Sequence, residues 1–169
     1  MKSIIADHRK VVFLKPGEVI VSSNPIMVST ILGSCVAITM YSPGKNAGAI
    51  CHAMYPNNPD QDENFLYVDS AVRHLFRKMI DYGGKADMVV KLFGGAKVLA
   101  CDYAEERRSV GEQNIMQAEI ILKELGLQIS KSDIGGLQGR KLFFSIKTGD
   151  VYLRKMKLNK DTCGLGVLP

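Results

Sequence analysis

Residues 26–54 read IMVSTILGSCVAITMYSPGKNAGAICHAM, and much of the information about the fold lies in this stretch. Three β-rich runs stand in this stretch, at residues 26–32, 36–41 and 48–54. The breaks between them, Gly33-Ser34-Cys35 and Ser42-Pro43-Gly44-Lys45, contain the small and turn-forming residues at which a chain reverses direction. The stretch therefore predicts three consecutive strands, of which the last two form an antiparallel hairpin.

Further strands are predicted on both sides of this stretch, and two helices follow it. Short β-type runs cover residues 10–15, 18–22, 87–93, 127–130, 140–146 and 151–156. Apolar residues recur at helical spacing over about 67–82 and about 111–125, and glycine follows each segment. The sequence predicts an α+β fold, in which mixed or antiparallel β-sheets are flanked by two main helices. We expect a single domain over residues 1–156 and a peripheral tail at 157–169.

Composition supports one globular domain that works in the cytoplasm. The chain has 169 residues, of which 46% are apolar and 23% charged. No apolar run approaches the roughly 18 residues that a membrane span requires, and the first eight residues do not build the core of a signal peptide. The polar segment 55–64, which contains two prolines, is predicted to be a flexible lid.

The charge pattern argues against a nucleic-acid-binding protein. The formal net charge is +5, but the basic residues are dispersed, tryptophan is absent and aromatic residues make up only 7%. Nucleic-acid-binding domains gather their charge on one face and supply aromatic stacking surfaces. A mild basic excess near residues 140–160 predicts either a solvated surface or a contact with an acidic protein partner.

Cysteine spacing predicts neither a disulfide framework nor a metal site. The four cysteines, Cys35, Cys51, Cys101 and Cys163, include no CxxC pair. Cys51 and His52 are neighbours, and neighbours on a strand point to opposite faces, so the two are not expected to bind one ion. We expect no metal and no organic cofactor.

Cys35 and His52 are the residues best placed for chemistry, since His8 and His74 are predicted to be solvent exposed. If the hairpin turn is centred between Pro43 and Gly44, Cys35 lies directly opposite His52. If the connection spans residues 42–47, the two are diagonal neighbours on the same face, still within side-chain reach. A thiol beside an imidazole forms a nucleophile and base pair, in which we expect the histidine to lower the pKa of the cysteine. A buried inert cysteine beside a hydrogen-bonded histidine is the alternative interpretation.

The longer motifs resemble the CheD family, the chemoreceptor glutamine deamidases. The resemblance begins with the segments Ser29–Ala37 and Gly48–Pro56, which contain Cys35 and His52. Further matches follow in order: Tyr67-Val68-Asp69, Lys91-Leu92-Phe93-Gly94-Gly95-Ala96, Val110-Gly111-Glu112-Gln113-Asn114, Asp133-Ile134-Gly135-Gly136, Gly139-Arg140-Lys141, Thr148-Gly149 and Arg154-Lys155. The match runs from about residue 10 to residue 156.

The resemblance implies a site and a reaction. The family's catalytic cysteine falls on Cys35 and its histidine on His52. Its threonine falls on Ser29, with Thr30 next to it, and either hydroxyl could orient the imidazole. Backbone N–H groups around Gly33 and Ser34 are candidates to stabilise an oxyanion.

The resemblance also implies the substrate and a partner. The expected activity is the hydrolytic deamidation of glutamine side chains on methyl-accepting chemotaxis receptors, and a CheC-type phosphatase is an expected partner. Two positions depart from the family pattern: Gln113, where arginine is usual, and Tyr55, where leucine is common. Two alternatives stay open: a module that binds a CheC-type phosphatase with little or no catalysis, and a cysteine amidase or esterase with another substrate, such as receptor methyl esters.

Overall fold

The structure is a computed structural model that describes residues 10–98 and 108–156 of the 169-residue chain. Its elements, in chain order, are β1 (Lys10–Phe13), β2 (Val19–Ser22), β3 (Ile26–Leu32), β4 (Val36–Ser42), the 3₁₀ turn η1 (Pro43–Lys45), β5 (Ala47–Ala53), α2 (Val68–Asp81), β6 (Val89–Gly94), α3 (Val110–Glu124), β7 (Ile129–Ile134), β8 (Arg140–Ser145) and β9 (Val151–Lys155). The predictions for His8, Cys101, Cys163 and the tail at 157–169 lie outside the described residues.

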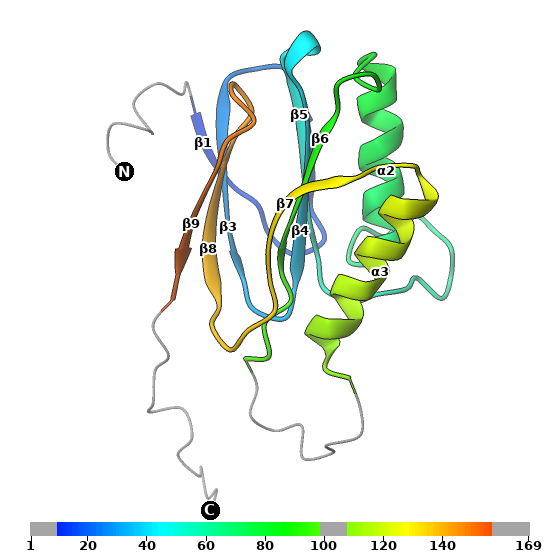
Figure 1. Cartoon of the computed structure of the whole chain (residues 1–169), viewed down its shortest axis with the longest axis vertical. Helices are drawn as coiled ribbons and strands as arrows, with labels where there is room; N and C mark the ends of the chain where they lie inside the picture. The colour runs from blue at the N-terminus through cyan, green and yellow to red at the C-terminus, as the bar shows by residue number, and fades with distance from the viewer. Residues whose placement is uncertain (1–9, 99–107, 157–169) are drawn as a thin grey trace, which may run out of the picture.

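The strands form two sheets that lie face to face, and both helices cover the outer side of one of them (Figure 1). The four-stranded sheet has the order β1-β3-β8-β9, and the five-stranded sheet has the order β2-β5-β4-β6-β7. Most neighbouring strands are antiparallel, whereas β1 with β3 and β6 with β7 are parallel. The predicted fold class, α+β with mixed sheets flanked by two helices, is therefore confirmed.

Strands β4 and β5 lie at the centre of the molecule and contribute to two apolar cores. Every residue of both strands is buried. Val36 and Ile38 pack in the core shared with the helices, whereas Ala37 and Ile50 pack in the core between the two sheets. Since successive side chains of a strand point to opposite faces, a strand covered on both sides needs apolar residues at nearly every position.

The two helices form where the apolar spacing predicts them. α2 buries a regular stripe consisting of Val68, Ala71, Val72, Leu75 and Met79. α3 begins after Ser109, whose side chain and that of Glu112 form a reciprocal capping box. Both helices agree with the predicted ranges to within one residue at each end. Within the described ranges, no helix is long and apolar enough to cross a bilayer.

β7 is the strand that the sequence located least well. The predicted range was 127–130, whereas the strand runs from Ile129 to Ile134. β7 is an edge strand that pairs only with β6. Its outward positions therefore accept polar side chains such as Ser130 and Lys131, and these hide the β-type pattern.

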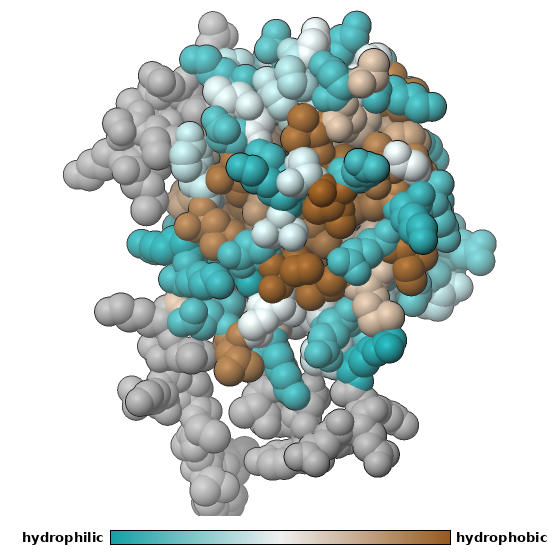
Figure 2. All heavy atoms as spheres, viewed as in Figure 1, coloured by the Kyte–Doolittle hydropathy of each residue, from teal (hydrophilic) through white to brown (hydrophobic). Residues whose placement is uncertain are grey.

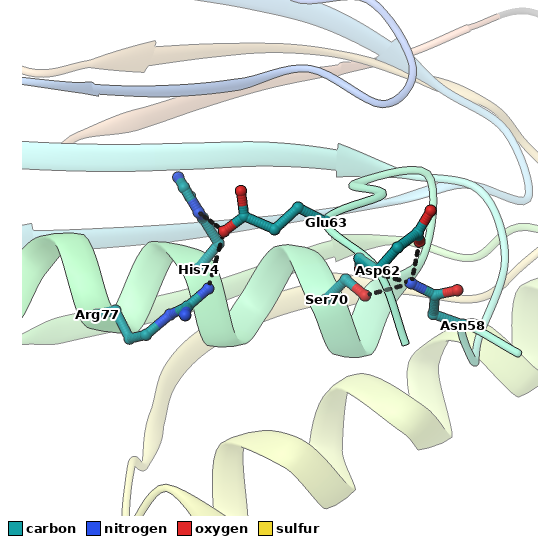
Figure 3. A network of polar contacts seen from close by, with 6 residues as sticks. All are labelled: Asn58, Asp62, Glu63, Ser70, His74 and Arg77. Atoms are coloured by element: carbon teal, nitrogen blue, oxygen red, sulfur yellow. Dashed lines mark hydrogen bonds and ion pairs between the residues drawn. The ribbon is translucent and has the colours of Figure 1, made fainter. Parts of the chain in front are cut away.

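The segment 55–64, predicted to be a flexible lid, is fastened to α2 (Figure 3). The backbone N–H of Asn58 donates to the Asp69 carboxylate at 3.0 Å. The side-chain contacts drawn in Figure 3 are Asn58 with Asp62 and Ser70, and Glu63 with Arg77 and His74. Because several contacts hold this short segment to α2, it is not a freely opening lid.

His74 is less exposed than the sequence predicts. Its side chain retains 16% exposure, and its ring lies against Phe65 with 4.4 Å between ring centroids. Burial lowers the pKa of His74, which Glu63 partly offsets. The prediction of an exposed histidine is wrong because segment 55–66 folds over this part of α2.

Two basic residues of the 140–160 region, Arg140 and Lys155, pair with Asp133. Arg140 is 1% exposed, and its Nε donates to Asp133 at 2.9 Å, so it is not available to an external partner. Lys155 also lies 3.7 Å from Asp133. Hydrophilic side chains are dispersed over the face shown in Figure 2, around and between apolar side chains near its middle.

One end of the sandwich gathers segments that are distant in sequence. The turn between β3 and β4, the end of β6, the first turn of α3 and the turn between β7 and β8 all lie at the lower end of Figure 1. Backbone hydrogen bonds join them, including Gly135 N to Gly94 O at 2.9 Å and Lys97 N to Gly136 O at 2.8 Å. Cys35 lies at this end.

We predict that large buried side chains provide most of the stability that the core between the two sheets gives the protein. Phe144, which is 0% exposed, is one of them. Phe144→Ala should lower the free energy of unfolding by about 3–5 kcal/mol, because it removes apolar contacts and leaves a cavity. Phe13→Ala is the matched control, since Phe13 is 51% exposed. Urea denaturation of both variants measures the difference, and equal losses would contradict the assignment of this core.

Candidate active site

Cys35 and His52 lie on the same face of the β4–β5 hairpin. Ala37 pairs with His52, and Val36 pairs with Ala53. Cys35 stands two residues before Ala37 and packs against the same core between the sheets. This is the second of the two registers expected from the sequence, in which Cys35 and His52 are diagonal neighbours. Such neighbours lie roughly 7–8 Å apart at the backbone and within reach of each other's side chains.

Thr30 holds the imidazole of His52. The Thr30 Oγ1 lies 2.8 Å from His52 Nδ1 and donates its own proton to the carbonyl of Leu14, also at 2.8 Å. A hydroxyl has one proton to give, so Thr30 accepts from His52, and Nδ1 carries the imidazole proton. The other ring nitrogen, Nε2, is buried and has no hydrogen-bond partner among the described residues. The neutral ring therefore presents a lone pair at Nε2.

Ser29 does not share this position. The sequence left Ser29 and Thr30 open as partners of the histidine, and they are neighbours on the extended strand β3. Since successive side chains alternate between faces, Ser29 belongs to the face opposite Thr30, although it is also buried, at 6% exposure. The structure brings Thr30 to His52 and places Ser29 on the other side of the sheet.

Burial keeps the candidate pair neutral. Burial lowers the pKa of His52, and the Leu14 carbonyl and the Glu18 carboxylate nearby oppose part of that shift. Burial raises the pKa of the Cys35 thiol. Both directions favour the uncharged forms. The resting pair is thus a thiol beside a neutral imidazole, whereas the sequence led us to expect a cysteine with a lowered pKa.

The turn that bears Cys35 is held by its carbonyl groups. Three consecutive carbonyls accept hydrogen bonds: Gly33 O from Ala96 N at 2.8 Å, Ser34 O from Asn114 Nδ2 at 3.0 Å, and Cys35 O from Gly95 N at 2.8 Å. In a trans peptide the C=O of one residue and the N–H of the next point in opposite directions. The N–H groups of Ser34 and Cys35 therefore point away from the 94–96 turn and α3.

Glycine at positions 94 and 95 permits this approach. Gly94 has a φ of 108° and Gly95 a φ of 69°, conformations that residues with a Cβ rarely adopt. A Cβ at position 94 would overlap the Cys35 carbonyl oxygen, and one at position 95 would overlap the side chain of Ile115. Gly94 of the Phe93-Gly94-Gly95-Ala96 motif is thus required by contact with the Cys35 turn, and Gly95 by contact with α3.

Cys51 has no part in this arrangement. It is fully buried in the core shared with the helices, on the face opposite His52, as the sequence predicts. Burial raises the pKa of its thiol to about 12. Among the described residues, no group of three or more His, Cys, Asp or Glu side chains is arranged to hold a metal ion.

Two wide hollows of the described surface lie elsewhere. Cavities of about 540 Å³ and about 500 Å³ open along α2 and the 61–63 segment, and neither Cys35 nor His52 lines them. Both are wide and are lined by charged side chains such as Arg77 and Glu63. Cys35 and His52 at the end of the sandwich are better candidates for chemistry than these hollows, because they combine a thiol with a buried base.

Comparison with known proteins gives the family. Residues 53–155 match the model of the family described as CheD, chemotactic sensory transduction. The protein belongs to the CheD family. The resemblance drawn from the motifs is confirmed at this level. The matched segment begins directly after His52, so Thr30, Cys35 and His52 lie before it.

Curated CheD relatives align with most of the chain. A probable chemoreceptor glutamine deamidase CheD 2 from Geobacter sulfurreducens is 40% identical over 154 residues, covering 89% of this chain and 94% of the relative. A probable chemoreceptor glutamine deamidase CheD from Maridesulfovibrio salexigens is 41% identical over 164 residues, covering 90% and 95%. One from Methanococcus maripaludis is 38% identical over 145 residues, covering 84% and 93%.

The two departures from the CheD motifs have local structural accounts. Gln113 lies on the exposed side of α3, and its Nε2 donates to the carbonyl of Arg108 at 2.9 Å. Tyr55 is 45% exposed and lies against Tyr67, with 5.7 Å between ring centroids. Neither residue contacts Thr30 or His52 through a recorded hydrogen bond.

We predict that Thr30 sets the tautomer of His52. In Thr30→Val the Nδ1 proton loses its acceptor, so ¹⁵N NMR of the histidine ring should show a larger share of the Nε2-protonated form than in the wild-type protein. Ser29→Ala is the control and should leave the spectrum unchanged. A wild-type pattern in Thr30→Val would contradict the assignment.

Proposed function

We propose that the protein deamidates glutamine side chains of methyl-accepting chemotaxis receptors, with Cys35 as nucleophile and His52 as base and acid. The activity and substrate are those in the names of its relatives at about 40% identity. The observation that carries the residue assignment is the hydrogen bond between His52 Nδ1 and Thr30, which leaves Nε2 as the acceptor on the face that Cys35 shares.

The first step forms a thioester. The sulfur of Cys35 attacks the amide carbon of the glutamine side chain while its proton passes to His52 Nε2. Because the resting pair is neutral, this proton moves as attack begins and is not already on the histidine. The amide carbon becomes tetrahedral and its oxygen carries the negative charge. Thr30 positions the ring throughout, since Nδ1 stays bonded to its hydroxyl.

Stabilisation of the oxyanion falls to the turn before β4. The carbonyls of Gly33 and Ser34 are engaged on one side, so the N–H groups of Ser34 and Cys35 point to the other, where the substrate would lie. Loss of one such donor typically costs about 2.7–4 kcal/mol of transition-state stabilisation. Gly33 contributes through the absence of a side chain in this turn.

The second half releases both products. Protonated His52 gives its proton to the amide nitrogen, the carbon–nitrogen bond breaks, and ammonia leaves. Water then loses a proton to His52 and attacks the thioester, which yields glutamate and restores the Cys35 thiol. The atoms balance as amide plus water giving carboxylic acid plus ammonia, and no cofactor takes part.

Two further proposals come from family resemblance. The substrate places the protein in the cytoplasm, where the modified part of the receptors would lie. A CheC-type phosphatase is the proposed protein partner. The 1–156 domain and the peripheral tail at 157–169 also stay as predictions.

We predict that deamidation depends on Cys35, His52 and Thr30 but not on Ser29. A receptor cytoplasmic fragment incubated with wild-type protein should gain about one mass unit per converted glutamine, detected by peptide mass spectrometry. Cys35→Ala and His52→Ala should lower the rate by at least about 10³-fold, and Thr30→Val by about tenfold or more through ring misplacement. Ser29→Ala and Cys51→Ala are the matched controls and should retain activity.

Other outcomes of this assay identify the alternatives. If no variant and no wild-type sample converts glutamine, while wild type and Cys35→Ala both bind a CheC-type phosphatase, the protein is a binding module. If methanol is released from receptor methyl esters and amides stay intact, it is an esterase. Activity retained in Cys35→Ala would refute the assigned nucleophile.

The neutral pair also predicts the pH dependence. His52 must be uncharged to accept a proton, and burial lowers its pKa. We expect kcat/KM to stay on its plateau as pH falls through about 6.5, the ordinary histidine pKa, and to fall only at lower pH. Initial rates measured between about pH 5 and 9, with circular dichroism at each pH as the control for folding, test this. A decline that already begins above pH 6.5 would contradict it.

A further inference from the structure

Asn114 occupies a position where α3 otherwise buries small or apolar residues. It is 0% exposed, and the other buried residues of the helix are Gly111, Ala118, Ile121 and Leu122. A polar amide in such a stripe is costly unless it is hydrogen-bonded. Asn114 ends the Val110-Gly111-Glu112-Gln113-Asn114 motif, but the motif alone predicts no role for it.

The Asn114 side chain bonds to both segments that carry the candidate pair. Its Nδ2 donates to the carbonyl of Ser34 at 3.0 Å and to the carbonyl of Met54 at 2.9 Å. Ser34 directly precedes Cys35, and Met54 follows His52 by two residues. Two carbonyl acceptors identify this atom as the nitrogen, because an amide oxygen in its place would have nothing to accept.

These bonds lie where the hairpin ladder has ended. The last pair of the β4–β5 ladder is Val36 with Ala53, so Ser34 and Met54 are beyond the reach of its backbone hydrogen bonds. The side-chain amide of Asn114 joins the two chain segments just beyond the last pair of the ladder, and so extends the connection between them by side-chain hydrogen bonds. Without it, the hydrogen bonds that the described residues make to the Cys35 turn are those from the 94–96 turn to the carbonyls of Gly33 and Cys35.

Close packing holds α3 in register for this contact. A Cβ at Gly111 would lie 2.5 Å from the Gly95 oxygen and 3.1 Å from the Ala96 oxygen. The first turn of the helix therefore rests directly on the backbone of the turn that binds Gly33 and Cys35. The helix position, and with it the Asn114 amide, is fixed relative to the Cys35 turn.

We propose that Asn114 is a positioning residue that sets the distance and direction between the Cys35 thiol and the His52 imidazole. This inference rests on the proposed roles of those two residues. A purely structural role is a poorer account, because the Oδ1 of Asn114 is buried without a partner among the described residues. An apolar side chain would fill the same space without an unpaired acceptor.

The test uses two changes at position 114. Asn114→Leu keeps the approximate volume and removes both donors, and Asn114→Asp keeps the shape and places carboxylate oxygens against two carbonyl oxygens. We expect kcat for deamidation of a receptor fragment to fall by at least about tenfold in both, because misplacement by about 1 Å costs about 10²-fold. KM should stay within about twofold, since the change affects reacting groups more than binding.

Ser109→Ala is the matched control for stability. It removes the capping box of the same helix and touches neither Ser34 nor Met54. Its melting temperature should fall, whereas its kcat should stay at the wild-type value. Iodoacetamide labelling of Cys35 against pH is the second readout, and we expect a changed profile in the Asn114 variants and an unchanged one in Ser109→Ala.

A folded Asn114→Leu protein with wild-type kcat and labelling profile would overturn the proposal. If neither variant folds, the test is made on the wild-type protein, labelled with ¹⁵N-asparagine and examined by NMR. The Asn114 side-chain amide protons should be protected from solvent exchange, and unprotected protons would overturn the proposal. Wild-type protein and Cys35→Ala are assayed in parallel. Failure of the proposed function gives an inactive wild-type protein or an active Cys35→Ala variant, whereas failure of this inference alone leaves the wild-type protein active and Cys35→Ala inactive.

Discussion

Direct contact between the backbones of two turns is the constraint on which the active end depends. The 94–96 turn donates to the carbonyls of Gly33 and Cys35, and it comes so near because Gly94 has no Cβ to collide with the Cys35 carbonyl. This contact fixes the direction of the peptide groups on either side of Cys35. It also provides the surface on which α3 rests through Gly111. The placement of Cys35, the proposed nucleophile, is thus a property of the backbone more than of side-chain packing.

Burial has a second consequence for the chemistry. It favours the uncharged forms of Cys35 and His52, and it equally favours a neutral ligand over a charged one. A glutamine side chain is neutral, whereas the glutamate formed from it is an anion at neutral pH. The environment that accepts the substrate therefore disfavours the product, which assists release and discourages the reverse reaction.

The sequence predicted the hairpin and the candidate pair. Which side chains of two adjoining strands share a face depends only on the length of the one short connection between them. It did not distinguish Thr30 from Ser29. Both faces of β3 are buried, as Met27 and Val28 show, so the alternation that would mark the face between the sheets is hidden. The deciding contact comes from the packing of β3 against β5, and no local pattern encodes that.

Other features were beyond prediction for a similar reason. Asn114 bonds to residues about 60 and 80 positions earlier in the chain, and a helical pattern shows which face is buried but not what lies against it. Arg140 belongs to a basic region in sequence, yet the fold buries it against Asp133. The lowered pKa of His52 and the raised pKa of Cys35 arise from burial, which follows only from the assembled sheets.

The pairing of β3 with β8 places a limit on when the site can form. Thr30 lies opposite Leu142, so the strand that presents Thr30 to His52 gains its antiparallel neighbour only after about a hundred further residues have been synthesised. At about 5–20 residues per second, a nascent chain waits on the order of ten seconds for that strand. During this interval the hairpin with Cys35 and His52 can form locally, but the sheet that carries Thr30 is incomplete. The contact between Thr30 and His52 therefore acquires its full supporting sheet late in biogenesis.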